Sequence, residues 1–196
     1  METSAASPKA VKRLALRQRR RTLSPAAQAQ AGRCLSGIAR ENMGIREFRT
    51  IAGYIAQDGE IDPAMLLEVF REAGAKILLP RTGPHHSLVF APEGTLAMTG
   101  PAGIPEPTQP EVELEAAPRP GLLLVPSVAL SPSGGRLGRG GGFYDRILAR
   151  ARNSGWQIVG VCHDDAVCDE LPLEHHDEPV DWVLTEKRLS RAGANE

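Results

Sequence analysis

The strongest constraint on the fold of this chain is an alternation of short apolar runs with stretches of helical character. The clearest run, 121–126, has the core Leu-Leu-Leu-Val and predicts a strand buried on both faces. Similar runs predict strands at 50–55, 76–79 (ending before Pro80), 87–90, 157–162 and 182–184. Helices are predicted at 9–21, at 25–39 after the capping pair Ser24-Pro25, at 63–73 and at 142–152. Strands that alternate with helices indicate an α/β fold, a mixed and mostly parallel sheet flanked by helices.

Length and composition set the class of protein. A chain of 196 residues with 41% hydrophobic and 24% charged residues is typical of a globular protein. We expect residues 1–8 to be disordered, residues 9–190 to form a single domain, and residues 99–120, rich in Pro and Glu, to form an ordered connector. No run approaches the ~18 apolar residues of a membrane span, and no secretory leader is visible. Three scattered cysteines predict neither a disulfide framework nor a zinc site, and favour the reducing cytoplasm.

Charge is distributed unevenly although the net charge is only −1. Residues 1–24 hold seven basic side chains against one acid, whereas residues 163–186 hold nine acids and neither Lys nor Arg. One run can meet phosphates and the other can hold a hard cation, although a solvated face is the ordinary use of each.

The most informative segment is a glycine-rich loop between the 121–126 strand and the 142–152 helix. Six of the nine residues 134–142 are glycine. Glycine adopts positive φ without a Cβ penalty, so such a run can wrap its backbone N–H groups around an anion at a helix N-terminus. Arg136 and Arg139 can each grip phosphate oxygens through two parallel hydrogen bonds. We therefore interpret this loop as a polyphosphate site rather than a flexible surface loop.

The loop fits neither of two familiar nucleotide motifs. No Gly-Lys-Ser/Thr follows at the place that a Walker loop requires, and Phe143 stands where a dinucleotide fingerprint has its third glycine. Asp145, just after the loop, is placed to act on a bound triphosphate through Mg²⁺. The alternative role for Asp145, an acid that merely favours the helix dipole, is equally compatible with the local sequence.

With these residues in place, the chain resembles the 5-formyltetrahydrofolate cyclo-ligases, also called 5,10-methenyltetrahydrofolate synthetases. The central match is Leu124-Val125-Pro126 followed by the 135–146 loop, similar to the family pattern Arg-Leu-Gly-x-Gly-x-Gly-Tyr-Tyr-Asp. Four further segments fall in the family's order, so the likeness runs from about residue 9 to 187: Lys9 and Arg13 ahead of 21–24, Tyr54 through Glu60-Ile61, Ile104–Pro107, and 171–186.

The resemblance implies a fold like that of the NagB/RpiA/CoA-transferase group and an ATP- and Mg²⁺-dependent ligase. That ligase cyclises 5-formyltetrahydrofolate, a reduced folate, to 5,10-methenyltetrahydrofolate and releases ADP and phosphate. It implies a small-molecule substrate, no nucleic-acid or membrane partner, and a monomer or weak homodimer. The implied ATP contacts are Lys9, Arg13, Arg136, Leu137, Gly138, Arg139, Gly140, Gly141, Gly142, Phe143 and Tyr144, with Lys9, Arg139 and Tyr144 catalytic. The implied folate contacts are Ile55, Glu60, Arg139, Gly140, Gly141, Gly142 and Phe143, and the implied magnesium ligands are Asp145 and Asp177.

Three positions depart from the family pattern. Leu130-Ser131 replaces a Phe-Asp pair, Phe143 replaces the first tyrosine of Tyr-Tyr-Asp, and 162–166 replaces a segment that usually carries a Phe and then a Gln. A diverged paralogue acting on a related folate, or a non-catalytic regulator that retains nucleotide binding, is therefore the alternative function.

Other chemistries find weaker support. His85-His86 and His175-His176 lack partners at ligand spacing, so surface or turn positions are expected for them rather than metal sites. No nucleophile elbow surrounds Ser127, Ser131 or Ser133. The basic 9–21 helix could bind RNA, but only eight aromatic residues and an acidic C-terminal third argue against an extended basic surface.

Overall fold

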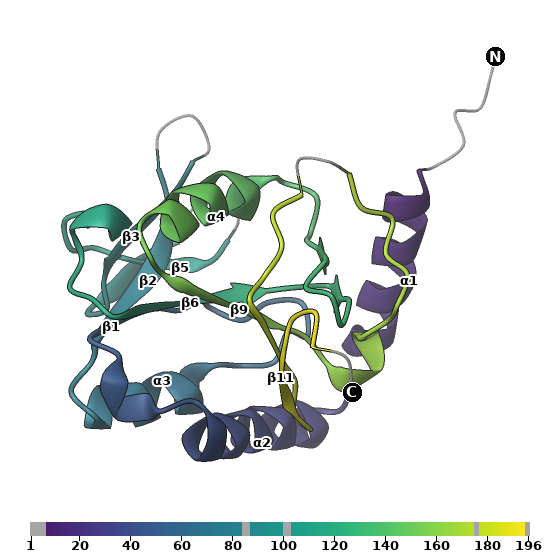
Figure 1. Ribbon diagram of the computed structural model, residues 1–196, viewed down its shortest axis with the longest axis horizontal. Helices are drawn as coiled ribbons and strands as arrows, with labels where there is room; N and C mark the ends of the chain where they lie inside the picture. The colour runs from purple at the N-terminus through teal and green to yellow at the C-terminus, as the bar shows by residue number, and fades with distance from the viewer. Residues whose placement is uncertain (1–6, 84–86, 100–102, 175–176, 195–196) are drawn as a thin grey trace.

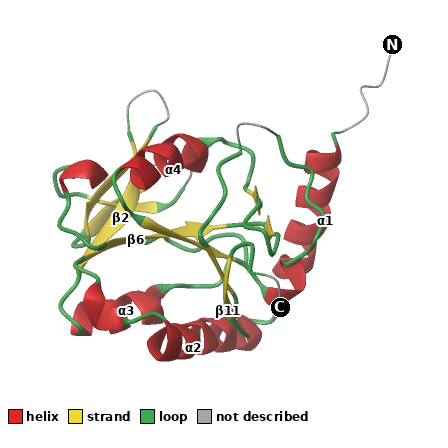
Figure 2. Cartoon of the chain, viewed as in Figure 1, coloured by secondary structure: helices red, strands yellow, loops and turns green. Residues whose placement is uncertain are grey.

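The computed structural model describes residues 7–83, 87–99, 103–174 and 177–194. Figures 1 and 2 show a central sheet with helices on both faces and helix α1 standing at one end. The helices are α1 (Pro8–Arg21), α2 (Pro25–Asn42), α3 (Ala64–Glu72) and α4 (Phe143–Asn153), with short 3-10 turns η1 (Ile45–Glu47), η3 (Leu114–Ala116) and η4 (Asp164–Ala166). The strands are β1 (Thr50–Ala52), β2 (Lys76–Thr82), β3 (Leu88–Pro92), β4 (Leu96–Thr99), β5 (Pro105–Pro107), β6 (Gly121–Pro126), β7 (Ala129–Leu130), β8 (Arg136–Leu137), β9 (Gln157–Val161), β10 (Trp182–Leu184) and β11 (Leu189–Arg191).

Seven strands form the main sheet in the order β11-β10-β9-β6-β1-β2-β3. The five central strands are parallel, and β11 and β3 are antiparallel strands at the two edges. The predicted class, a mixed and mostly parallel sheet flanked by helices, is confirmed. From β1 the chain proceeds to β2 on one side, and from β6 it proceeds to β9 and β10 on the other, so the strand order reverses between β1 and β6. Ligands of open α/β sheets bind at such a reversal, beside the carboxyl ends of the strands.

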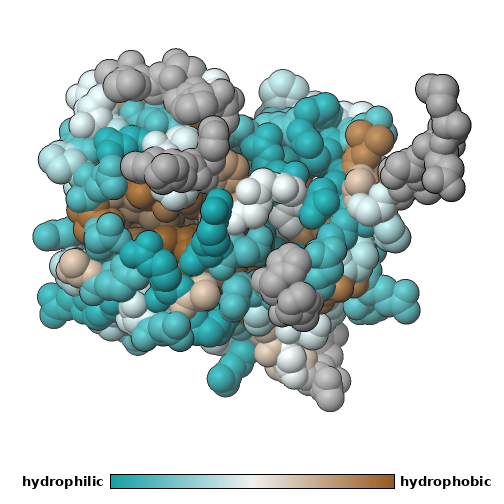
Figure 3. Space-filling view, turned by 90° about the horizontal axis from the view of Figure 1, so that it is seen from above, coloured by the Kyte–Doolittle hydropathy of each residue, from teal (hydrophilic) through white to brown (hydrophobic). Residues whose placement is uncertain are grey.

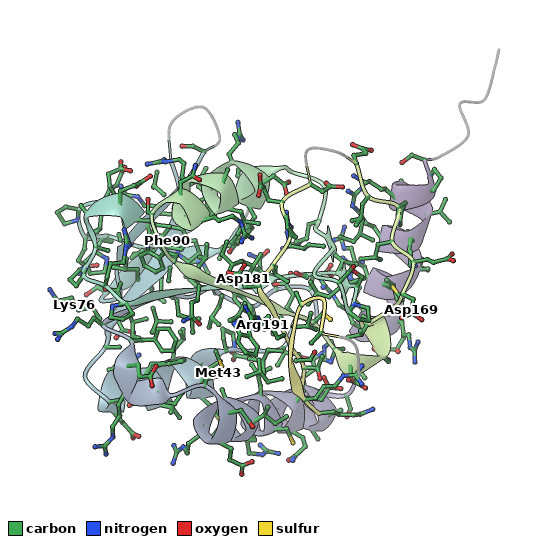
Figure 4. The ribbon with its side chains drawn as sticks, in the orientation of Figure 1. Met43, Lys76, Phe90, Asp169, Asp181 and Arg191 are labelled. Carbon is green, nitrogen blue, oxygen red and sulfur yellow. The ribbon has the colours of Figure 1, made fainter. Side chains whose placement is uncertain are left out.

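The two faces of the sheet bury separate cores. Helices α2 and α3 cover one face, where Leu35, Phe70 and Leu122 are fully buried. Helix α4 covers the other, where Leu123 and Leu148 are fully buried. Figure 4 shows the side chains of Phe90 and Met43 on opposite sides of the sheet. Because successive strand residues point to opposite faces, the unbroken Leu-Leu-Leu-Val run of β6 supplies both cores.

Several predicted boundaries were wrong. The strand expected at 50–55 ends at Ala52, because Gly53 and the following residues leave the sheet. The strand expected to stop before Pro80 continues to Thr82, because β1 has ended and Pro80 pairs only with Phe90 of β3. Proline tolerates such an edge, where its missing N–H has no partner to lose. Ser7 and Pro8, expected to be disordered, cap and open α1, while residues 1–6 lie outside the described residues.

The connector expected at 99–120 contains more structure than predicted. Strand β5 pairs with β4 and η3 follows it. Strands β7, β8 and β11 were not predicted either, because strands of two or three residues leave no periodic pattern. Helix α2 begins at the predicted cap, where Ser24 accepts a hydrogen bond from the Ala27 amide, and runs past Ala39 to Asn42.

Candidate functional site

A cleft of about 550 Å³ lies at the carboxyl ends of the central strands. It is lined by residues that follow β1, by Pro126 at the end of β6, and by the last three residues of β2. Helix α1 borders the cleft on one side, and β2 and β3 lie on the other (Figure 1). The volume is within the usual range of small-molecule sites, about 300–1,000 Å³. The site therefore lies at the strand reversal that the topology defines.

Every residue to which the sequence assigns a binding or catalytic role lines this cleft. They are Lys9, Arg13, Ile55, Glu60, Arg136, Leu137, Gly138, Arg139, Gly140, Gly141, Gly142, Phe143, Tyr144, Asp145 and Asp177. The fold thus brings residues from both ends of the chain to one place. The face seen in Figure 3 is mostly hydrophilic, with hydrophobic residues gathered in a recess.

The glycine loop is a backbone cradle that side chains would fill. Gly140 and Gly142 have φ of 101° and 63°, the left-handed region that favours glycine. A Cβ on Gly138 would lie 2.5 Å from Nη1 of Arg136, and one on Gly141 would lie 2.6 Å from the Phe143 ring. The glycines therefore serve the conformation of the loop and keep its surface open to a ligand.

Arg136 is the buried cation beneath this cradle. Its side chain is only 4% exposed and forms an ion pair with Asp145 in the first turn of α4. Its Nε has no hydrogen-bond partner among the described residues. A buried donor without a partner is costly in a folded protein, and an anionic ligand is one way to satisfy it. The residues present here fit a phosphate group.

A second cation and acid pair closes the α1 side of the cleft. Nζ of Lys9 lies 2.7 Å from Oδ2 of Asp177 and 3.3 Å from Glu174. Arg13, one turn further along α1, donates from Nε to the carbonyl of Gly138 at 2.8 Å. The i, i+4 spacing of Lys9 and Arg13 places both on the cleft face of the helix, as predicted.

The carboxylates near the glycine loop could hold a magnesium ion only if phosphate oxygens of a ligand supplied further coordination. In the described part of the chain, no three His, Cys, Asp or Glu side chains are grouped so as to hold a metal ion. Asp145 and Asp177 are the two expected ligands, and each is paired with a cation of the cleft. Mg²⁺ is commonly held by one or two carboxylates plus substrate phosphates, which agrees with this donor set.

Glu60 belongs to a tight turn that follows β1. The Glu60 amide donates to the Gln57 carbonyl at 2.9 Å, and Asp58 and Gly59 between them have φ of 54° and 77°. Two positive φ values in succession are typical of a type I′ turn, for which Asp-Gly is a favoured pair. Burial raises the pKa of the Glu60 carboxyl, and the charges of Arg20 and Arg139 oppose that rise.

Two further side chains connect the turn with the glycine loop and α4. Nη1 of Arg139 donates to Oε1 of Gln57 at 2.8 Å. Burial raises the pKa of the Tyr144 hydroxyl, and the Glu60 carboxylate raises it further. Tyr144 is thus a neutral hydroxyl close to Glu60 at neutral pH. The residues expected to contact folate and those expected to contact phosphate therefore line one continuous cleft.

Three residues of the cleft region, Glu106, Asp58 and His163, carry no role in the sequence prediction. Glu106 is buried and accepts hydrogen bonds from the amide and hydroxyl of Thr82. Asp58 accepts from arginines of α1, and Nε2 of His163 lies 2.9 Å from the Gly59 carbonyl. The Asp-Gly pair was a turn signal that could have placed Asp58. Nothing local distinguishes Glu106 or His163.

The basic residues of α1 are engaged within the protein. All seven contact acids or carbonyls: Lys9 with Asp177, Lys12 with the Glu170 carbonyl, Arg13 with the Gly138 carbonyl, Arg19 with Asp165, and Arg17, Arg20 and Arg21 with Asp58. Figure 1 shows the C-terminal segment running beside α1. Lys9 and Arg19 therefore pair with acids of the 163–186 run and Lys12 with one of its carbonyls, whereas Arg17, Arg20 and Arg21 share Asp58.

Two of the departures from the family pattern have structural roles. Ser131 is buried, and its Oγ accepts from the Gly135 amide at 2.8 Å, which supports the first turn of the glycine loop. Cys162 is buried beside a smaller cavity of about 240 Å³ behind Glu60. His85, His86, His175 and His176 lie outside the described residues. No helix in the described ranges is long and apolar enough to cross a bilayer.

The open parallel sheet and the cleft at its reversal point define an α/β protein whose cleft lining of cations and glycine-loop amides fits an anion beside a buried carboxylate. The sequence pattern of the 5-formyltetrahydrofolate cyclo-ligase family matches residues 5–186. The chain belongs to the 5-formyltetrahydrofolate cyclo-ligase family, a family of ligases.

Individual relatives and solved structures agree with this assignment. The 5-formyltetrahydrofolate cyclo-ligase of Mycolicibacterium smegmatis is 35% identical over 90% of this chain and 92% of its own length. That of Escherichia coli K12 is 32% identical over 89% of this chain and 98% of its own. The structure of the 5,10-methenyltetrahydrofolate synthetase of Aquifex aeolicus matches with a TM-score of 0.80 at 26% identity, covering 97% of this chain and 95% of that one. A second synthetase structure, from Mycoplasma pneumoniae, has a TM-score of 0.73 at 18% identity over 92% and 99% of the two chains, and supports the fold.

Proposed function

We propose that this protein cyclises 5-formyltetrahydrofolate to 5,10-methenyltetrahydrofolate, using ATP with Mg²⁺ and releasing ADP and phosphate. The observation that carries the proposal is the convergence in one cleft of the basic face of α1, the glycine loop with buried Arg136, and Glu60. Family membership supports the cyclo-ligase activity. The three free cysteines suit a reducing cytoplasm, where we propose that the enzyme acts.

The chemistry requires activation of the formyl oxygen. That oxygen is a poor leaving group, and transfer of the γ-phosphoryl group to it allows it to depart as phosphate when N10 closes the ring. Enzymes that transfer phosphoryl groups act mainly by positioning and charge stabilisation. Bound Mg²⁺ would neutralise phosphate charge, with Asp145 and Asp177 as its protein ligands.

We assign the residues of the cleft to these tasks. Lys9, Arg13 and Arg136 hold the phosphates together with the amides of the glycine loop. Arg139, between the turn and the loop, stabilises charge that develops on the transferred group, and Tyr144 orients it. Ile55, Glu60 and Phe143 hold the pterin, with Glu60 accepting hydrogen bonds from its N–H groups and Phe143 supplying an aromatic surface.

The decisive experiment is a turnover assay with the purified protein. Mg-ATP and 5-formyltetrahydrofolate should yield the absorbing methenyl product with one ADP formed per product. Omission of ATP or addition of EDTA should stop the reaction. Arg139→Ala and Asp145→Ala should abolish turnover in proteins that remain folded; Arg139→Ala should leave thermal unfolding unchanged, whereas Asp145→Ala should lower Tm because it leaves the buried Arg136 without its acid. Arg150→Ala, on the outer surface of α4 with Glu113 and Glu115, is the matched control and should retain activity.

The outcomes separate the alternatives. Failure of the folded protein to bind ATP in the presence of magnesium, measured by calorimetry, would refute the proposal. Binding of both ligands without turnover would instead indicate a non-catalytic regulator, and turnover of only another reduced folate would indicate a diverged paralogue.

A further inference from the structure

The turn at 57–60 is held by α1 from the side away from the cleft. The Arg20 guanidinium is buried, donates from Nε to the Asp58 carbonyl at 2.6 Å, and places Nη2 3.4 Å from Oε1 of Glu60. Glu60 lines both the main cleft and the smaller cavity behind it, whereas Arg20 lines only the smaller cavity. Arg20 thus supports Glu60 from behind.

The Glu60 carboxylate can still accept hydrogen bonds from a ligand in the cleft. Oε1 faces Arg20, and Oε2 accepts from the Gln57 amide at 3.1 Å. An ionised carboxylate has about four lone-pair sites on its two oxygens, so each oxygen can accept one more hydrogen bond. This arrangement suits a ligand that presents two adjacent N–H groups, which is the chemistry of an aminopyrimidinone ring edge.

We propose that Arg20 is a positioning residue for substrate recognition: it orients Glu60 so that both carboxylate oxygens accept from the N–H edge of the pterin. This inference rests on the proposed function. Arg20 itself does not line the main cleft and is not a catalytic residue.

Neighbouring arginines provide the comparison that isolates this role. Arg17 donates from Nε to Oδ2 of Asp58 at 2.7 Å, and Arg21 also pairs with Asp58. All three arginines stabilise the same turn, but among the described contacts only Arg20 also reaches Glu60. A loss of turn stability should therefore follow from each substitution, whereas loss of substrate affinity should follow from Arg20 alone.

The test compares Arg20→Met with Arg17→Met in the full-length protein. Arg20→Met should raise the Kd for 5-formyltetrahydrofolate about 10-fold or more, because a hydrogen bond to a charged group is lost and Glu60 is free to turn or take up a proton. Its Kd for Mg-ATP should change by less than about 2-fold, and Arg17→Met should leave both constants near wild type. Calorimetry measures both, and thermal unfolding checks that each variant is folded.

The pH dependence of folate binding distinguishes a positioning role of Arg20 from a purely structural one, because a structural role would not change it. The titratable and charged groups that face Glu60 are Arg20, Asp58, Tyr54, Arg139, Tyr144 and His163. Arg20 opposes the rise in the pKa of Glu60 that burial causes, so its removal raises that pKa further. As the pH is lowered, folate binding by Arg20→Met should therefore begin to weaken at a higher pH than folate binding by the wild type. Arg20→Lys, which keeps the charge, should restore most of the difference.

The possible results are distinct. A wild-type protein that binds no 5-formyltetrahydrofolate would overturn the proposed function and this inference with it. Wild-type binding combined with equal affinities in Arg20→Met and Arg17→Met would overturn the inference alone. If Arg20→Met does not fold, Arg20→Lys decides the question. A folate affinity far below that of the wild type, together with a fall in binding at a different pH from the wild type, would contradict the role assigned to Arg20, because this variant retains the charge.

Discussion

Asp58 should stabilise the fold more than any exposed ion pair of α1, and the prediction is tested with Asp58→Asn. Burial alone raises the pKa of this carboxyl, but hydrogen bonds from Arg21 and Arg17 outweigh burial and lower it from 3.8 to about 2. The Asp58 side chain is 9% exposed, whereas its partners Arg17 and Arg21 are 30% and 56% exposed, so solvent screens part of these contacts. One pKa unit corresponds to about 1.4 kcal/mol, and with that screening allowed for the ionised carboxylate contributes about 2 kcal/mol.

The sign of the pH dependence follows from the lowered pKa. The contribution of Asp58 is fully present above the unfolded pKa and is lost as the pH falls through the folded pKa. The difference in unfolding free energy between wild type and Asp58→Asn should be constant near neutral pH. It should shrink between about pH 4 and pH 2.

Urea unfolding at several pH values measures this difference. At neutral pH we expect Asp58→Asn to lose about 2 kcal/mol, or about 4–8 °C in Tm for a chain of this size. Asp165→Asn is the matched control, because Asp165 also pairs with an arginine of α1, Arg19, but is 45% exposed. Its expected loss is about 0–1 kcal/mol. Equal losses in the two variants, or a difference that does not depend on pH down to 2, would refute the reasoning.

Four further predictions concern the glycine loop, helix α2 and the buried thiol. Arg136→Met should raise the Kd for Mg-ATP by about 10- to 100-fold in calorimetry, because a buried charged donor to the phosphates is lost; an unchanged Kd would contradict the phosphate site. Gly142→Ala should reduce turnover, because φ at this position is 63° and an L side chain is strained there. Gly37→Ala, in α2 with open space around it, should instead raise the free energy of unfolding by about 0.5–1 kcal/mol. Cys162 should react with a thiol reagent at pH 8 far more slowly than the partly exposed Cys34, because burial raises the pKa of the Cys162 thiol; equal rates would show that the site opens readily.

Much of the central sheet could be predicted because its signals are local. The run at 121–126 and the shorter run at 182–184 were predicted to the residue, since uninterrupted apolar side chains have no stable place except between two layers. The strand that begins at Lys76 was predicted too short. Proline disrupts a strand only where its missing N–H would have bonded to a neighbouring strand, and whether β2 has such a neighbour at Pro80 depends on where β1 ends. Strand β11, only three residues long, forms because β10 offers it an edge.

The glycine loop and its arginines predict an anion site from sequence alone, because backbone freedom and fixed charge are properties of the residues themselves. The turn at 57–60 could have been predicted from Asp58-Gly59 for the same reason. That Arg20 of α1 packs behind Glu60 could not be predicted, because a pairing across forty residues depends on how the helix docks on the sheet.

Local conformation and chemical capacity were therefore determined by the sequence: a buried parallel core, a glycine-rich loop that carries arginines, a basic helix and an acidic tail. The tertiary structure decided which charges meet. Lys9 and Asp177 are 168 residues apart, and they form a pair only because the strand order returns the C-terminal segment to the side of α1. Because salt screens exposed charges that lie more than about 10 Å apart, the partners of a charge are set by the packing of the fold and not by the spacing along the chain.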